Sequence, residues 1–117
     1  MKKKLLTFCF LIFLFSCEAF FVEDISQENV ILLAPSNDSQ LSSGIIRFDW
    51  EGIEEATNYR IQIATPNFTN AVQVLLDSTI TSLNFSKELE TGGFEWRVKA
   101  MNSDYETSYS TSSFSVN

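Results

Sequence analysis

The sequence predicts an all-β protein, a seven-stranded antiparallel β-sandwich that occupies residues 29–117. Apolar and polar residues alternate with a period of two in short runs, which is the pattern of strands with one buried face. These runs recur at intervals of roughly 10–12 residues, with turn-forming residues between them. Because no part of 29–117 shows a helical period, the short strands favour two antiparallel sheets packed face to face.

The first three expected strands cover residues 30–33, 45–50 and 59–63. A turn-rich stretch, residues 35–39, ends the first of them. In the second, Ile46 and Phe48 share a face while Arg47 lies on the other, so this strand has one buried face.

Four further strands are expected at residues 72–76, 83–85, 94–100 and 114–116. The strand over 94–100 has the clearest alternation, because Phe94, Trp96 and Val98 are separated by charged residues.

The N-terminus has the pattern of an export signal. A basic stretch, residues 1–4, precedes an apolar run from Leu5 to Phe15 that only Thr7 interrupts. A helix of this length rises about 16 Å, roughly half of a ~30 Å hydrocarbon layer, so it is too short to span a membrane. We therefore predict a secretory signal peptide over residues 1–16.

The residues Leu14-Phe15-Ser16-Cys17 resemble the lipobox of bacterial lipoproteins. The resemblance implies cleavage before Cys17 and attachment of diacylglycerol and further acyl chains, such as palmitate, to that residue. Two or three chains make a stable membrane anchor, which one chain does not. The alternative is ordinary secretion, with Cys17 as an unmodified thiol. In the lipoprotein interpretation, residues 17–28 comprise the lipidated Cys17 and an acidic tether.

The composition excludes several classes of site. The chain has no His and only two Cys, at positions 9 and 17, which excludes His-dependent triads and Cys/His zinc sites. Its net charge is −7, and residues 17–117 carry 5 basic against 15 acidic residues, a difference of −10. Nucleic acid is therefore not an expected partner. The sequence points to no cofactor and no metal.

The strand motifs resemble those of a fibronectin type III domain. Trp50 closes the second strand, Tyr59-Arg60-Ile61-Gln62-Ile63 forms the third, and the run from Phe94 to Asn102 forms the sixth. The Leu32–Pro35 opening is similar to that of surface and periplasmic lipoproteins of glycan-degrading Gram-negative bacteria of the Bacteroidetes type. The resemblance covers about 29–117. It implies the fold rather than an activity, since this architecture hosts many functions.

One residue departs from the family pattern. The family usually has a tyrosine where Phe94 stands, and that tyrosine donates a hydrogen bond to the backbone. Phenylalanine keeps the packing and loses this bond, which should cost roughly 1 kcal/mol unless another contact compensates.

Aromatic residues are the first candidates for a ligand site. Trp50 and Trp96 lie on the apolar phase of their strands, so core packing is favoured over sugar stacking. Phe68 stands in a turn-rich loop between Asn67 and Asn70, which makes these three residues a candidate ligand-contact loop. The alternative is that Phe68 plugs the open end of the sandwich, as the family motif suggests.

Asp77-Ser78-Thr79 resembles an O-glycosylation sequon of the same bacterial lineage, with Ser78 as the acceptor. Its expected place between two strands would expose it. The alternative is an unmodified turn, because three-residue patterns arise often by chance.

Charged residues on the expected loops and strands have simple explanations. Asp104 and Glu106, beside Tyr105, lack the spacing of a calcium loop, so we interpret them as a solvated acidic loop. Arg60, Arg97 and Lys99 should form cross-strand ion pairs on an outer sheet face, near Glu95.

If the strand order is that of the family, the N-terminus lies at the same end as loops 51–58, 77–81 and 102–108. A lipid anchor would hold this end toward the membrane. Loops 36–44, 65–71 and 87–93 would point outward.

No serine has a His partner, and no pair of carboxylates stands out, so we do not expect an enzyme. The leading hypothesis is a lipid-anchored binding or adhesion module of the envelope, for a protein or glycan. It would be an outer-membrane lipoprotein, facing either the cell surface or the periplasm. The alternative is a spacer or accessory subunit of an outer-membrane complex for glycan uptake. In either case the membrane is a partner through Cys17, and the oligomeric state is open.

Overall fold

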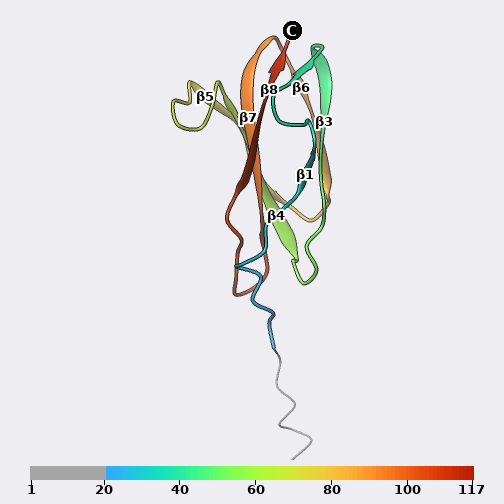
Figure 1. Cartoon of the computed structure of the whole chain (residues 1–117), viewed down its shortest axis with the longest axis vertical. Coiled ribbons are helices and arrows are strands. Elements are labelled where there is room, and N and C mark those ends of the chain that lie inside the picture. Colours follow the sequence, from blue (N-terminus) through green and yellow to red (C-terminus); the bar gives the residue numbers. More distant parts are fainter. Residues whose placement is uncertain (1–20) are drawn as a thin grey trace, which may run out of the picture.

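The computed structural model describes residues 21–117, and these form two β-sheets packed face to face (Figure 1). This confirms the all-β sandwich. The signal peptide, Cys17 and the start of the tether lie outside the described residues. In the part of the chain that the structure describes, no helix is long and apolar enough to cross a membrane.

The smaller sheet has three antiparallel strands in the order β1-β3-β6. These strands are β1 (Leu32–Ala34), β3 (Gly44–Trp50) and β6 (Asn84–Leu89). The alternation predicted for residues 45–50 is confirmed. The buried side chains are Ile46, Phe48 and Trp50, and the exposed ones include Ile45 and Arg47.

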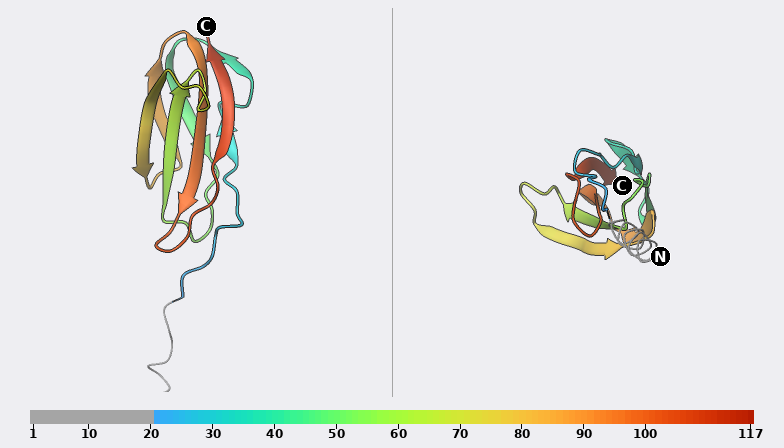
Figure 2. Two further views of the ribbon diagram at one scale, coloured as in Figure 1. Left: turned by 90° about the vertical axis from the view of Figure 1, so that its left-hand side faces the viewer. Right: turned by 90° about the horizontal axis from the view of Figure 1, so that it is seen from below.

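The larger sheet has five strands in the order β2-β8-β7-β4-β5 (Figure 2). They are β2 (Ser39–Leu41), β4 (Asn58–Thr65), β5 (Gln73–Ile80), β7 (Gly92–Met101) and β8 (Ser110–Val116). β7, which has the clearest alternation in the sequence, is an inner strand of this sheet, because it pairs with both β4 and β8.

Strand β2 lies within residues 36–44, which were expected to form a loop. It has three residues and pairs with β8 in parallel, with Gln40 opposite Ser115. The expectation of purely antiparallel pairing is therefore wrong at this edge. After β1 the chain crosses from the smaller sheet to the larger one, and a three-residue strand is too short to show a period.

Aromatic side chains fill the core between the sheets. Trp50 and Trp96 are both buried, as expected for core residues, and the Trp96 indole Nε1 donates a hydrogen bond to the Pro35 carbonyl oxygen at 3.2 Å. Phe48 packs edge-on against Trp96, with ring centroids 5.1 Å apart. Phe94, the residue that departs from the family pattern, stacks on Phe114 at 5.4 Å.

The folded unit includes residues that precede position 29. Ile25 is only 2% exposed and belongs to the hydrophobic core, although it lies in the acidic segment expected to act as a tether. A turn follows it, in which the Glu28 amide donates to the Ile25 carbonyl at 2.9 Å. Phe21 does not pack on the domain, because it is 88% exposed. Any free tether after Cys17 therefore ends before Ile25.

The two ends of the sandwich are distinct. The N-terminal end has the segment 21–29 with loops 51–57, 81–83 and 102–109. The remote end has loops 42–43, 66–72 and 90–91 together with the C-terminus (Figure 1). At the N-terminal end, the Asn102 side-chain amide donates to the carbonyl oxygens of Glu23 at 2.9 Å and Glu55 at 3.3 Å. This confirms that the N-terminus lies with loops 51–57 and 102–109.

Candidate functional site

The loop between β4 and β5 folds onto the outer face of the five-stranded sheet. Phe68 lies over this face, and its backbone amide donates to the Glu95 carboxylate at 3.0 Å. The interpretation of Phe68 as a plug in the open end of the sandwich is therefore wrong. Since Ala64 is fully buried although it lies on the outward phase of β4, the loop shields this part of the sheet.

Phe68 forms one side of a cation–π stack around Arg97 on β7. The Arg97 guanidinium carbon lies 4.0 Å from the centre of the Phe68 ring and 4.3 Å from that of Tyr109. The Arg97 Nε also donates to the Gln62 amide oxygen at 2.7 Å. Each aromatic contact of this kind contributes about 0.5–2 kcal/mol. Phe68 is thus engaged within the domain and is only half-buried, which leaves its outer side accessible.

The two asparagines of the candidate ligand-contact loop differ in their surroundings. The side-chain oxygen of Asn67 accepts a hydrogen bond from the Asn70 amide at 2.7 Å, so Asn67 shapes the turn. The Asn70 side chain is exposed. Of the three residues proposed for ligand contact, Asn70 has the most accessible polar group. Ligand contact at this loop stays a prediction.

Ser78 lies within a strand rather than in the expected turn. β5 continues to Ile80, and Ser78 pairs with Ile61, which is buried and faces the core. The expected turn at 77–81 is therefore wrong, because the alternation continues through the small, polar Ser78 to Ile80. Ser78 is half-buried on the inner face, so its hydroxyl is less accessible than the sequence predicted. Glycosylation of Ser78 stays a prediction.

Arg60 and Asp77 form a bidentate ion pair across β4 and β5. The Arg60 Nε and Nη2 each lie 2.8 Å from an Asp77 carboxylate oxygen. These hydrogen bonds lower the pKa of Asp77 below its usual value and raise that of Arg60. Lys99 pairs with Glu106 at 3.2 Å, whereas Arg97 uses aromatic rings in place of an acidic partner. Of the three cations expected to form cross-strand ion pairs, only Arg60 does so. The partner of Lys99, Glu106, lies in the loop before β8 and not on a strand.

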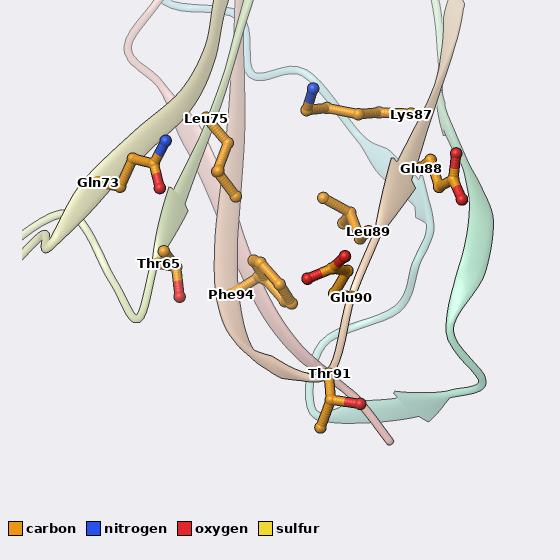
Figure 3. Close-up of a pocket in the computed structure, with 9 residues that line it drawn as sticks. All are labelled: Thr65, Gln73, Leu75, Lys87, Glu88, Leu89, Glu90, Thr91 and Phe94. Atoms are coloured by element: carbon orange, nitrogen blue, oxygen red, sulfur yellow. The ribbon is translucent and has the colours of Figure 1, made fainter.

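The remote end contains a cleft of about 590 Å³ between the edges of the two sheets (Figure 3). Its apolar lining comes from Leu75 on β5, Leu89 on β6 and Phe94 on β7. Leu89 and Phe94 are buried, while Leu75 is half-buried, so Leu75 offers the accessible apolar surface.

Polar groups surround this apolar lining. Lys87 extends across the cleft from β6, the Glu90 carboxylate and the Gln73 amide point into it, and the Glu88 carboxylate points away (Figure 3). Among residues 21–117, Lys87 is the one basic residue that forms neither an ion pair nor a cation–π contact. An ammonium, a carboxylate and an amide around an apolar wall are the groups that orient a polar ligand.

The cleft was not predicted from the sequence, although one residue, Lys87, indicated it. Lys87 pairs with the buried Ile46, so it occupies the core-facing phase of β6, between Phe85 and Leu89. A charged residue in an otherwise apolar phase marks a place where the core is open. Leu75 gave no signal, because it protrudes at an irregularity in the pairing of β4 with β5.

The acidic loop holds no grouped metal ligands. Within the range 21–117, no three His, Cys, Asp or Glu side chains come together in a way that could hold a metal ion. Asn102 organises this loop instead, because its side-chain oxygen accepts the amides of Asp104 at 3.1 Å and Tyr105 at 2.9 Å.

Comparison with solved structures places the fold among fibronectin type III domains. The chain is similar to the fibronectin(III)-like modules of Clostridium thermocellum CbhA, with a TM-score of 0.55 and 12% identity over 75% of this chain and 95% of that one. It is also similar to the fibronectin type III domain of human KIAA0970, with a TM-score of 0.58 and 9% identity over 81% of this chain and 77% of that one.

A third similar structure is CopC from Methylosinus trichosporium OB3b, with a TM-score of 0.51 and 15% identity over 76% of this chain and 94% of that one. No family model matches the chain, and no curated protein matches it by sequence. The protein therefore has a fibronectin type III-like β-sandwich. Because the identities are low, the likeness extends to the fold alone.

Proposed function

We propose that this protein is a non-enzymatic, lipid-anchored envelope protein that binds a protein or glycan at its remote end. The anchor rests on the lipobox resemblance at Cys17. The observation that carries the binding role is the cleft between β5 and β6, which opens at the end of the domain farthest from the N-terminus. A chain anchored at Cys17 would direct this cleft away from the membrane.

The cleft supports binding because it has an accessible apolar side chain and uncommitted polar groups. Leu75 provides the apolar contact, and Lys87, Glu90 and Gln73 provide an ammonium, a carboxylate and an amide. This combination suits a sugar or a peptide, since both present apolar and hydrogen-bonding surfaces together.

The alternative is a spacer or accessory subunit that docks by a sheet edge or a sheet face. Docking by the outer face of the five-stranded sheet has less support. Arg97, a charged residue on that face, is enclosed by Phe68 and Tyr109 and donates a hydrogen bond to Gln62. Replacing Arg97 by Glu would thus disturb the domain itself. The face keeps few free charged groups for a docking partner.

The location is tested by protease digestion of intact cells that express the tagged full-length chain, with a periplasmic marker as control. We expect the tag to be lost while the marker stays intact. Protection of the tag until the outer membrane is permeabilised would contradict exposure at the surface and would direct the search to partners in the periplasm.

The binding role is tested by screening the full-length chain against arrays of glycans and envelope proteins. We expect Lys87→Ala to weaken any binding that the wild-type chain shows. Arg47→Ala is the matched control, because Arg47 lies on the neighbouring strand β3 but on the outer face, where it pairs with Asp49 at 3.0 Å. Equal effects of the two substitutions would contradict binding at the cleft.

A further inference from the structure

The sandwich has four edge strands, and three of them have features that prevent pairing with another chain. β1 and β2 have three residues each, and Pro35 follows β1 directly. β6 carries Lys87 on its inner face. Short strands, proline and inward-pointing charges are among the devices by which proteins protect exposed edges, as are β-bulges.

The fourth edge strand, β5, has an irregularity in its pairing with β4 at Leu75, but it lacks the three devices found on the other edges. It has eight residues, from Gln73 to Ile80, and contains no Pro, Gly or Lys. Its one charged residue, Asp77, is neutralised by Arg60. Val74 is 53% exposed on this strand, and Val72, just before it, is 86% exposed. Among the described residues, no segment pairs with the outer edge of β5.

The cleft lies directly beside this unpaired edge. Gln73 and Leu75 belong to both β5 and the cleft lining. A strand added to β5 would lie about 4.8 Å farther out, and alternate side chains would point toward the cleft. Leu75, Leu89 and Phe94 would then receive apolar side chains from the added strand.

We propose that β5 is a docking edge for an extended strand of a partner protein, which lengthens the five-stranded sheet and inserts apolar side chains into the cleft. This inference rests on the proposed binding function and specifies its partner class. In such complexes, main-chain hydrogen bonds supply affinity and side-chain pockets supply specificity.

The charge of the domain favours a strand with Lys or Arg. Residues 21–117 contain 5 basic and 14 acidic residues, a difference of −9, and Glu90 points into the cleft at the end of β6. A basic residue of the partner strand would pair with Glu90 and gain from the field of the domain.

A second copy of this chain is a poorer occupant. It would carry the same acidic excess. Antiparallel pairing of two β5 strands would also place the two N-terminal segments at opposite ends of the dimer, which conflicts with anchoring both copies to one membrane through short tethers.

The test uses the full-length chain in detergent micelles and a peptide of about ten residues in which valine alternates with threonine and lysine. Amide hydrogen exchange is measured by NMR with and without the peptide. We expect exchange to slow at the amides of residues 73–80. A peptide with the same sequence but N-methylated at alternate backbone nitrogens cannot donate the required hydrogen bonds, and it should not bind.

Two matched variants locate the contact. Val74→Lys adds an edge-protecting charge to β5 and should weaken peptide binding by roughly tenfold or more. Ile45→Lys makes the same kind of change at an exposed residue of β3, which is not an edge strand, and should leave binding unchanged. If thermal unfolding shows that Val74→Lys disturbs the fold, Val72→Lys replaces it.

Several results would overturn the docking edge. These are equal binding of the N-methylated peptide, protection outside residues 73–80, or no binding of either peptide. Protection of β5 before peptide is added, in a sample with the mass of a dimer, would assign the edge to a second copy. Glycan or protein binding that depends on Lys87 but not on Val74 would leave the proposed function intact while the strand-docking inference fails.

Discussion

The two ends of this sandwich differ in how the chain closes them. At the N-terminal end, Ile25 is a buried member of the hydrophobic core. The Asn102 side chain there connects three segments through hydrogen bonds to Glu23, to Glu55 and within its own loop. The Tyr59 hydroxyl also accepts a hydrogen bond from the Ile53 amide at 3.0 Å. Side-chain hydrogen bonds to the backbone therefore seal this end.

The remote end has no comparable closure between β5 and β6. A cleft separates the two strands there, and Leu75 and Val74 stay accessible beside the unpaired edge. The domain therefore combines a sealed end, where a tether would enter, with an open end that offers unused contacts. We expect substitutions at the sealed end to affect stability and those at the open end to affect binding.

The largest effect is expected at Ile25. Ile25→Ala removes a buried side chain from the core and should lower the free energy of unfolding by about 2–4 kcal/mol, measured by urea unfolding. Ile45→Ala is the control and should cost less than about 0.5 kcal/mol, because Ile45 is 77% exposed. Similar values for the two variants would show that residues before position 29 are not part of the folded unit.

Asn102 comes next. Asn102→Ala removes the donor to two carbonyl oxygens and the acceptor for two amides, and should cost about 1–3 kcal/mol. The matched control at the remote end is Asn70→Ala, which should change stability by less than about 0.5 kcal/mol. If the control lost as much stability as Asn102→Ala, the two ends would not differ as described.

A smaller effect is expected on the outer face at Phe68. Phe68→Ala removes one side of the stack on Arg97 and should cost about 1 kcal/mol in urea unfolding. Phe68→Leu retains an apolar side chain and separates the contribution of the aromatic ring from that of burial. Full stability in the leucine variant would mean that the cation–π contact contributes nothing.

The smallest effect is a pH dependence at Asp77. Its pKa is lowered in the folded protein by the hydrogen bonds from Arg60, so the pair stabilises the fold at pH values above the unfolded pKa of about 4. This contribution is lost as the pH falls through the lower folded pKa. Asp77→Asn should therefore show a weaker fall in stability between about pH 5 and pH 2 than the unaltered chain. Identical pH profiles would contradict the role of the pair.

Sequence alternation predicted much of the fold but little of the open end. The buried phases of β3, β4 and β7 were clear because each has several large apolar residues at a period of two. The place of Phe68 was not predictable in this way, since a loop has no period and its fold-back depends on a distant partner, Arg97.

Ile25 and the cleft were missed for a related reason. Ile25 lies between polar neighbours in an acidic segment and so shows no pattern, although it belongs to the core cluster. The cleft arises where two strands consecutive in the chain, β5 and β6, belong to different sheets, which is a property of topology. In the sequence, only Lys87 indicated the cleft, because it is a charged residue on the core-facing side of β6.

The proposed function requires that the remote end be the accessible contact end of the anchored protein. It is tested by labelling intact cells with a bulky polyethylene-glycol maleimide, using Asn70→Cys at the remote end and Asp104→Cys at the N-terminal end. We predict rapid labelling of the Asn70→Cys variant and slow labelling of the Asp104→Cys variant. Equal labelling of both variants, or faster labelling at position 104, would contradict the claim.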